Sequence, residues 1–369
     1  MRPLTVLSIA YPLAPVGPDA AGGSEQILTL LDRALVRGGH CSVVIAPEGS
    51  RTEGVLIPAR LPQCTLDDQV RAAAEQRYRP LIHRALDRWS FDLVHMHSLD
   101  FHAYLPPPGV PVLATLHLPL DWYPNWIFQE TRSDFWLQCV SASQQSRCPA
   151  GAPVLPYIEN GVPLEGLRTA VRRRSYALAL GRICPEKGFH LALDAAAEAS
   201  TPLLLAGQIF PYRAHHDYFR GELMPRLDGR CRRFIGPAGL ARKRRLLAGA
   251  RCLLVPSLVP ETSSLVAMEA LACGTPVIAF PSGALPDIVE HGRTGFIVEN
   301  AHQMAQAIRE SARIHPEVCR QAARRRFSAD RMIAEYLCLY ERLVSHVRAR
   351  EARAGSSGSD RYGLVTTGP

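Results

Sequence analysis

Short apolar runs alternate along the chain with longer segments in which apolar positions recur at helical spacing. Residues 4–10 form the first such run and predict a buried strand. Residues 24–38 place their Ile and Leu side chains on one face, which predicts a helix that Ser24 caps and that two glycines end. The alternation continues with strands over 42–46, 93–95 and 112–116 and a basic helix over 67–89. We therefore expect a parallel sheet whose strands end at a common ligand-binding edge.

A second series of the same kind follows a break in the pattern. Residues 156–163 hold two prolines and an Asn-Gly pair, which are typical of a linker. Further strands are expected after it, over 176–180, 203–207 and 252–257. The pattern thus predicts an α/β protein of two domains, residues 1–160 and 161–330. A final helix is expected over residues 331–350, and the Gly- and Ser-rich residues 351–369 are expected to form a disordered tail.

Composition is typical of a soluble globular protein. Apolar residues make up 47% of the 369 residues and charged residues 21%, and no stretch of about 18 apolar residues suggests a membrane span. The ten cysteines are scattered singly and the N-terminus lacks the apolar region of a signal peptide. Both features favour a reducing, cytoplasmic setting, and the cysteine spacing argues against a zinc site. The net charge of +8, nearly all of it arginine, leaves nucleic acid, an anionic membrane surface and phosphorylated ligands open as partners.

The most informative stretch is residues 252–274, where a strand, a turn and a helix are expected in succession. Glu269 falls in the apolar stripe of the helix, where a carboxylate is costly unless a group hydrogen-bonds to it. The alternatives are that Glu269 lies on a different face of the helix, that an arginine from elsewhere in the chain pairs with it, or that it binds a ligand with two hydroxyls, such as a ribose. Glu261 lies in the loop before the helix, near the free amides of its first turn. We expect Ser263 or Ser264 to cap this helix.

Two cations flank a tight loop at the end of strand 176–180. Arg182 and Lys187 precede the next helix there, and fixed cations at a helix N-terminus suit a diphosphate. Lys187 is one of only two lysines in a chain rich in arginine, which favours a specific role for its ammonium group. In the first half, the turn Gly22-Gly23 can also bring backbone amides close to an anion. The alternatives are a solvated pair of surface cations and a plain tight turn.

Several other positions carry weaker signals. His117 directly follows strand 112–116 at the ligand-binding edge, where a lone histidine is either structural or a ligand contact. The pair His95 and His97 lacks nearby Cys or carboxylate residues that would complete a metal site. The aromatic residues within 122–128 would either stack on an acceptor ring or pack their own loop onto the domain. The charge run 242–245 is expected to be a solvated face.

These motifs resemble one known family. The spacing of Glu261 and Glu269 resembles the E-x7-E motif of retaining glycosyltransferases of the GT-B fold, family 4, also described as glycosyl transferases group 1. Residues 270–279 and 283–298 are similar to the helix, turn and strand that follow this motif in the family. The chain departs from the family at residues 262–264, where Thr-Ser-Ser stands and Phe-Gly often follows the first glutamate. The resemblance spans nearly the whole chain and is most specific in the second domain.

The resemblance implies two Rossmann-like domains facing a cleft, the first binding the acceptor and the second a nucleoside diphosphate sugar. It implies transfer of a hexose, from a donor of the UDP-glucose or GDP-mannose type, to a hydroxyl with retention of configuration, and a final helix that crosses back to the first domain. No metal and no cofactor are expected, because Arg, Lys and helix ends replace them. Catalytic roles are implied for Glu261, His117, Arg182 and Lys187. Donor contacts are implied for Gly22, Gly23, Arg182, Lys187, Glu261, Thr262, Ser263, Ser264, Leu265 and Glu269.

Two other classes of function are alternatives. A nucleotide-sugar epimerase or a phosphorylase would use the same fold, although the Arg-x4-Lys and E-x7-E pair disfavours the epimerase. The basic surface would also suit a non-catalytic protein that binds anions, and it leaves open a peripheral contact with an anionic membrane. The sequence contains no nucleic-acid-binding motif, so nucleic acid is not expected as a partner.

Overall fold

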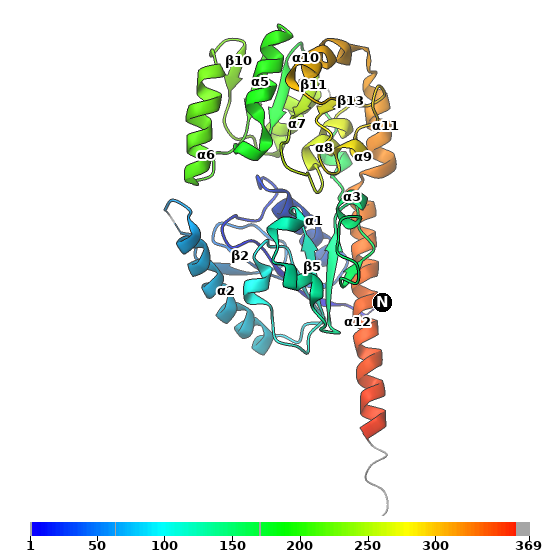
Figure 1. Cartoon of the computed structure of the whole chain (residues 1–369). Coiled ribbons are helices and arrows are strands. Elements are labelled where there is room, and N and C mark those ends of the chain that lie inside the picture. The colour runs from blue at the N-terminus through cyan, green and yellow to red at the C-terminus, as the bar shows by residue number, and fades with distance from the viewer. Residues whose placement is uncertain (1, 63, 170, 359–369) are drawn as a thin grey trace, which may run out of the picture.

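The computed structural model describes residues 2–62, 64–169 and 171–358 and contains two parallel sheets (Figure 1). Within these residues the first sheet has seven strands in the order β3-β2-β1-β4-β5-β6-β7. The apolar runs of the first half form its central strands, as the sequence predicts. The strands are β1 (Thr5–Ile9), β2 (Cys41–Pro47), β3 (Val55–Ala59), β4 (Leu93–Met96), β5 (Val112–Leu116), β6 (Phe135–Cys139) and β7 (Val154–Leu155).

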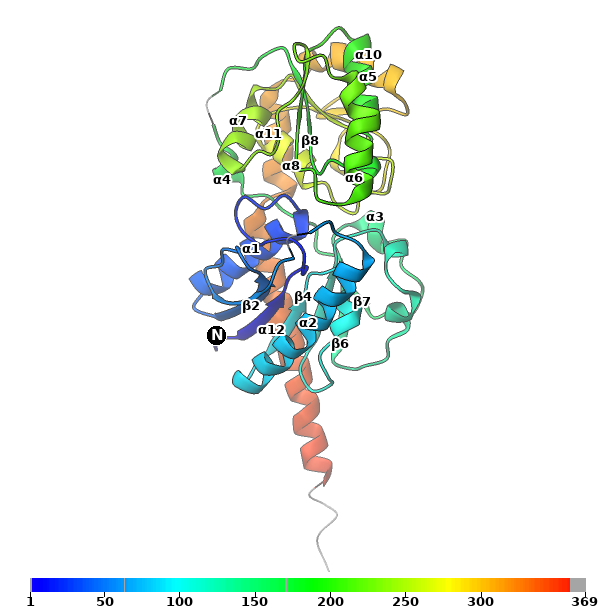
Figure 2. The ribbon, with the colours of Figure 1, turned by 90° about the vertical axis from the view of Figure 1, so that its left-hand side faces the viewer.

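Alternate residues of the first sheet face two helix layers. Leu7 and Ile9 of β1 pack with α2 (Asp68–Arg88), whereas Val6 packs with α1 (Gly23–Arg37) on the other face. Figure 2 shows α2 in front of this sheet and the long C-terminal helix behind it. Covering both faces is what a buried parallel sheet requires. The shorter helices here are η1 (Phe101–Tyr104), η2 (Leu120–Trp122), η3 (Asn125–Gln129) and α3 (Ala142–Gln145).

The second sheet repeats the plan with six strands, in the described residues, in the order β10-β9-β8-β11-β12-β13. Its strands are β8 (Ala177–Leu180), β9 (Leu203–Ala206), β10 (Arg232–Phe234), β11 (Cys252–Val255), β12 (Val277–Ala279) and β13 (Gly295–Ile297). One face packs against α5 (Phe189–Glu198) and α10 (Ala301–Glu310), and the other against α7 (Leu240–Gly249), α8 (Leu265–Ala272) and α11 (Pro316–Arg326). The smaller helices are α4 (Leu164–Leu167), α6 (Arg213–Tyr218) and α9 (Leu285–Ile288). The predicted α/β architecture of two Rossmann-like domains is confirmed.

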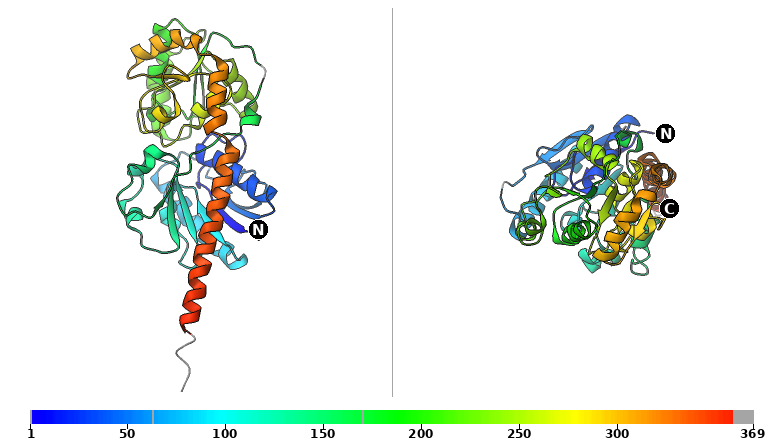
Figure 3. Two further views of the ribbon diagram at one scale, coloured as in Figure 1. Left: turned by 90° about the vertical axis from the view of Figure 1, so that its right-hand side faces the viewer. Right: turned by 90° about the horizontal axis from the view of Figure 1, so that it is seen from above.

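The last helix, α12 (Ala329–Gly358), connects the two domains. It begins beside the second sheet, runs along the first domain and projects past it (Figure 3). Tyr336 and Tyr340 are fully buried there against the face of the first sheet that α1 also covers. The Tyr340 hydroxyl lies 2.6 Å from Nδ1 of His95 in β4. Two chain crossings run side by side between the domains, since Val162 N donates to Phe327 O at 2.8 Å.

The C-terminal end of α12 corrects one prediction. The helix continues to Gly358, so a disordered tail is wrong for residues 351–358. Ala, Arg and Glu, which favour helices, fill the sequence beyond residue 347, and no breaker occurs before Gly355. The remainder of the expected tail, 359–369, lies outside the described residues. None of the described helices combines the length and the apolar character needed to cross a membrane.

Candidate active site

The loop between β11 and α8 positions the first glutamate of the E-x7-E pair. Ser264 occupies the N-cap position of α8, as expected, but its side chain makes no capping bond. The first amides of any α-helix lack a carbonyl partner within the helix, and in α8 the Ser264 side chain does not supply one. These amides form the positive end of α8. Gly283 fixes the loop from the opposite side, where Ala284 N donates to Glu261 O at 2.7 Å. With φ of +59° and only 2.1 Å between a Cβ at this position and Glu261 O, Gly283 admits no larger residue.

Glu261 lies at the centre of a buried ion pair. Its Oε1 accepts hydrogen bonds from Lys187 Nζ at 2.6 Å and from the Ser257 hydroxyl, and its side chain is only 10% exposed. Burial raises the pKa of Glu261, but the Lys187 ammonium, the Ser257 hydroxyl and the Arg182 charge together hold that pKa below its usual value. The carboxylate is therefore ionised at neutral pH.

The loop after β8 carries both predicted cations. Lys187 ends the short helix η4 (Pro185–Lys187), and Leu258 N donates to Glu186 O at 2.8 Å, which ties this loop to the one after β11. The half-buried Arg182 guanidinium forms no hydrogen bond or ion pair with any described residue. Burial raises the pKa of Glu25 in the first domain, and the Arg182 charge acts against that rise. Arg182 thus offers an unpaired guanidinium at the junction between the domains.

Glu269 finds its partner in the charge run of α7. Lys243 Nζ donates a hydrogen bond to Glu269 Oε1, and the two side chains are 11% and 4% exposed. The prediction of a solvated face over 242–245 is therefore wrong for Lys243, because α7 packs beside α8 and turns this side chain inward. Lys243 Nζ also approaches Gln26 Oε1 of α1 at 3.4 Å. The Glu269 Oε2 atom makes no hydrogen bond within the described ranges, so it is available to a ligand.

The glycine turn of the first domain faces α8. A Cβ at Gly23 would lie 3.4 Å from Leu265 Cδ1, which is ordinary contact across the domain junction. A Cβ at Gly22 would lie 1.9 Å from Oε2 of the buried Glu25 side chain, so a larger residue here would require the Glu25 carboxyl to move. The predicted N-cap at Ser24 is wrong, because α1 begins at Gly23 and the Ser24 hydroxyl donates instead to Glu25 Oε1 at 3.0 Å.

His117 follows β5 and is linked to the second domain. Its carbonyl oxygen accepts from the Thr262 hydroxyl at 2.7 Å, and its Nε2 lies 3.1 Å from His97 Nδ1. Burial lowers the pKa of His117 to about 3, so the ring is neutral at physiological pH. Since His97 Nε2 is buried without a partner among the described residues, the less costly tautomer places the His97 proton on Nδ1, from where it donates to His117 Nε2. His117 Nδ1 then carries a proton that it can donate to a ligand.

Acid is expected to destabilise the fold through these histidines. The pKa of His117 is depressed from 6.5 to about 3, and burial lowers those of His95 and His97 in the same direction. Between these values the unfolded chain binds protons that the folded chain excludes, so stability falls as the pH falls, by up to about 1.4 kcal/mol per pH unit for each histidine. The thermal midpoint should drop from about pH 7 to about pH 4. The drop should be smaller in His117→Asn, and an equal drop in both proteins would contradict the assignment.

Contacts between the domains enclose the site. Leu240 N at the start of α7 donates to Asp19 Oδ1 of the first domain at 2.9 Å, and the Tyr11 and Tyr212 hydroxyls lie 3.2 Å apart. Beside α8 the junction contains a cavity of about 330 Å³, lined by Ser141 and Tyr157 from the first-domain side and by Ser263 from the loop before α8. The Ser263 hydroxyl is buried and has no hydrogen-bond partner among the described residues. It is thus a further polar group at the junction that a ligand could satisfy.

The structure brings the predicted residues together from both domains. Lys187 pairs with Glu261 in the loop before α8, and the Arg182 charge acts on the same carboxylate. Gly23 and His117 reach that helix and its loop from the first domain. Sequence reasoning missed Ser257, His97 and Lys243. Lys243 did carry a signal, because it is the second of only two lysines in the chain.

Comparison with protein families gives two matches, one in each half of the chain. The model described as Glycosyltransferase Family 4 matches residues 21–150, which form most of the first domain. The model described as Glycosyl transferases group 1 matches residues 174–313, which contain the second sheet and the Glu261–Glu269 pair.

Curated relatives and solved structures agree with these matches. The chain is 26% identical over 350 residues to the phosphatidyl-myo-inositol mannosyltransferase of Mycobacterium leprae, covering 84% of this chain and 88% of that protein. It is 26% identical over 348 residues to the glycogen synthase of Mycobacterium tuberculosis, covering 79% and 81%. Sucrose-phosphate synthase from Thermosynechococcus elongatus has a similar fold, with a TM-score of 0.80 at 20% identity over 93% of this chain and 100% of that one. Anabaena HepE in complex with UDP-glucose has a TM-score of 0.69 at 19% identity over 91% and 99%.

Proposed function

Because the chain belongs to the family 4 and group 1 glycosyltransferases of the GT-B fold, we propose that it transfers a hexose from a nucleoside diphosphate sugar to a hydroxyl acceptor with retention of configuration. The observation that supports this most is the Lys187–Glu261 pair in the loop before α8, with the charge of Arg182 acting on the same carboxylate. Two cations and a helix end suit a diphosphate, and an ionised carboxylate beside them suits the hydroxyls or the developing positive charge of a sugar.

The donor is proposed to be of the UDP-glucose or GDP-mannose type. A mannosyltransferase and a glycogen synthase stand among the relatives at the same level of identity. One protein of similar fold has been solved in complex with UDP-glucose. Both donor types share the ribose and the diphosphate, which are the parts that the residues described above would bind.

The chemistry would proceed on one face of the sugar. The bond between the anomeric carbon and the diphosphate oxygen breaks, and the bond to the acceptor oxygen forms on the same side. The leaving phosphate takes the acceptor proton. Arg182 and Lys187 would donate to the phosphate oxygens more strongly as their negative charge grows, which lowers the barrier. Each such charge-assisted bond is worth about 1.5–3 kcal/mol.

Glu269 and Lys243 would bind the nucleoside. The free Oε2 of Glu269 can accept from a ribose hydroxyl, while Lys243 donates to Oε1 and holds the carboxylate in place. His117 would donate from Nδ1 to a hydroxyl of the donor sugar. Catalysis would need the two domains to close, because His117 and Glu269 come from opposite sides of the junction.

Three further properties belong to this proposal. The transfer would need no metal or cofactor, because the two cations and the end of α8 supply the positive charge. The enzyme would work in the cytoplasm, as the scattered cysteines favour. Peripheral contact with an anionic membrane is compatible with the net charge of +8.

Nucleotide binding tests the donor site directly. We expect one of UDP, GDP and ADP to raise the thermal midpoint of the wild-type protein, because a ligand that binds only the folded state stabilises it by mass action. In Glu269→Ala the shift should be lost, since the carboxylate that accepts from the ribose is gone.

The matched control is Glu299→Ala, which removes an exposed carboxylate and should keep the full shift. If no nucleotide stabilised the wild-type protein, the proposal that it is a glycosyltransferase would be wrong. An epimerase or a phosphorylase would bind nucleotide or phosphate but would not transfer sugar to a hydroxyl. An assay for sugar transfer therefore distinguishes these enzymes from a glycosyltransferase.

A further inference from the structure

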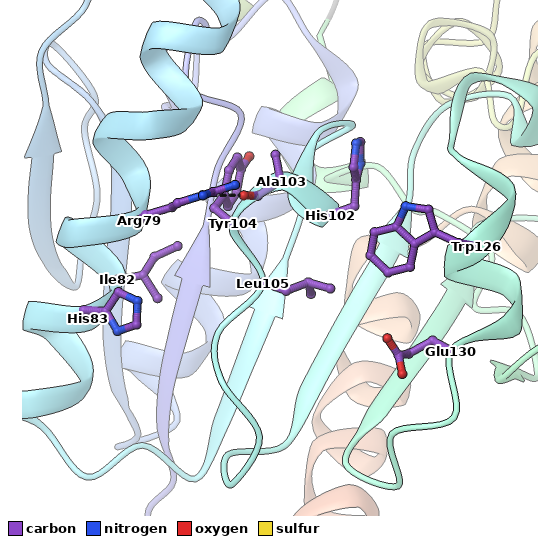
Figure 4. Close-up of a pocket in the computed structure, with 9 residues that line it drawn as sticks. All are labelled: Arg79, Ile82, His83, His102, Ala103, Tyr104, Leu105, Trp126 and Glu130. Atoms are coloured by element: carbon purple, nitrogen blue, oxygen red, sulfur yellow. Dashed lines mark hydrogen bonds between the residues drawn. The ribbon is translucent and has the colours of Figure 1, made fainter.

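A cavity of about 410 Å³ lies on the first domain and contains none of the residues placed in the active site (Figure 4). Helix α2 forms one wall, η1 the floor, and the segment that includes η3 the opposite wall. Its volume falls in the range of about 300–1,000 Å³ that is usual for small-molecule sites. We propose that it binds a sugar unit of the acceptor that is remote from the reacting hydroxyl. This inference rests on the proposed function and makes the acceptor a glycan or a glycoconjugate.

Trp126 supplies the aromatic wall. Its side chain extends from η3 toward the cavity, and 44% of the residue is exposed, although tryptophan is usually well buried (Figure 4). His102 supports the indole from η1 in an edge-on contact, with ring centroids 6.1 Å apart. A rigid indole held in this way offers an apolar surface on which the C–H face of a sugar ring can pack.

Two charged groups of opposite sign complete the lining, and each is anchored at one atom. Arg79 Nε donates to Ala103 O at 2.7 Å, and its two terminal nitrogens, which have no partner in the described part of the chain, can donate to a ligand. Glu130 Oε1 accepts from Thr131 N at 2.9 Å and from Arg132 N at 3.0 Å, which leaves Oε2 free to accept. Hydroxyls both donate and accept, so a sugar can satisfy both groups at once. An anionic lipid headgroup would suit Arg79 but would be repelled by Glu130.

The segments that line the cavity begin at two strand ends beside the active site. The floor, η1, follows β4, and Tyr104 within it donates to Asp100 Oδ1 at 2.6 Å. The wall that carries Trp126 belongs to the segment that begins after His117 at the end of β5. Because both segments leave the edge of the sheet that carries His117, a glycan with its reacting hydroxyl there can extend over η1 to Trp126.

Saturation-transfer NMR on the full chain tests this assignment. The probes are glucose, mannose, N-acetylglucosamine and their linear oligomers, each with and without UDP or GDP. We expect at least one probe to bind the wild-type protein, and its affinity to fall about tenfold or more in Trp126→Ala and in Glu130→Gln. The control is Trp122→Ala, which removes a tryptophan of the same segment that is 38% exposed and does not line the cavity. It should bind like wild type, and all variants should keep the nucleotide shift.

Three outcomes would overturn the inference. The first is that no saccharide binds the wild-type protein. The second is that both tryptophan variants lose binding equally. The third is sedimentation of the wild-type protein with phosphatidylglycerol vesicles that is lost in both tryptophan variants, because this would assign the segment to membrane contact. If nucleotides bind but saccharides do not, only this inference fails, whereas loss of both removes the proposed function as well.

Discussion

Replacing Lys187 by methionine is expected to lower kcat for sugar transfer by about 10²- to 10³-fold, the usual loss when a preorganised donor to a developing negative charge is removed. Lys187 Nζ is held 2.6 Å from Glu261 Oε1, so it needs little reorganisation to meet the leaving phosphate. Methionine retains the length of the side chain and removes only the charge and its donors. Steady-state kinetics with the nucleotide sugar identified by the thermal-shift experiment would measure the loss.

A misfolded site would mimic this result, so the variant needs a structural control. Lys187→Met leaves Glu261 buried without its cation, which costs stability. In the double variant Lys187→Met with Glu261→Gln, both charges are absent, and the thermal midpoint should recover. The rate should not recover, because neither residue can act on the donor. Recovery of both would show that Lys187 is only structural.

The other lysine gives a second comparison. Lys243→Met should mainly raise KM for the donor, since Lys243 contacts Glu269 at the proposed ribose position and not the diphosphate. Equal losses of kcat in the two lysine variants would contradict the division of roles proposed here.

Replacing Tyr340 by alanine is expected to cost about 3–5 kcal/mol of stability, as for other large aromatic residues removed from a core. Tyr340 is fully buried against the first sheet, and its hydroxyl is paired with His95 Nδ1 at 2.6 Å. The loss should fall on the first domain. Differential scanning calorimetry with saturating nucleotide, which stabilises the second domain, would separate the two transitions.

Two further variants of α12 calibrate this result. Tyr340→Phe removes only the hydroxyl and should cost about 1–3 kcal/mol, because His95 is left with one unpaired nitrogen. Arg342→Ala changes an exposed residue of the same helix and should have little effect. A first-domain transition that Tyr340→Ala left unchanged would mean that α12 does not contribute to the core of that domain.

The sequence predicted the fold well where one local pattern determines each element. The apolar runs 4–10 and 252–257 became central strands because a strand covered on both faces needs apolar residues throughout. The end of α12 was predicted too early, because the helix-forming residues beyond 347 extend the helix into the segment whose Gly- and Ser-rich composition is typical of a disordered tail. The N-cap of α1 was also predicted two residues too late, because the helix already begins at Gly23 and Ser24 lies within its first turn.

The active site was predictable only in part, because its contacts join distant segments. The need of Glu269 for a partner followed from its position in an apolar stripe, but the identity of that partner depends on how α7 packs on α8. In the same way, the pairing of Lys187 with Glu261 joins two strand ends that only the order of the second sheet places side by side. The link from Thr262 to His117 requires knowing how the domains meet.

The crossing of α12 has a consequence for synthesis of the protein. A ribosome makes the residues of the first sheet and α1 early, but α12, which shares one face of that sheet with α1, comes after the whole second domain. The second domain can therefore fold before the first domain is complete. Until α12 has been made, part of the apolar face that contains Leu4, Val6 and Leu113 is exposed to solvent. During that interval the early domain is the part of the chain most exposed to aggregation and most in need of a chaperone.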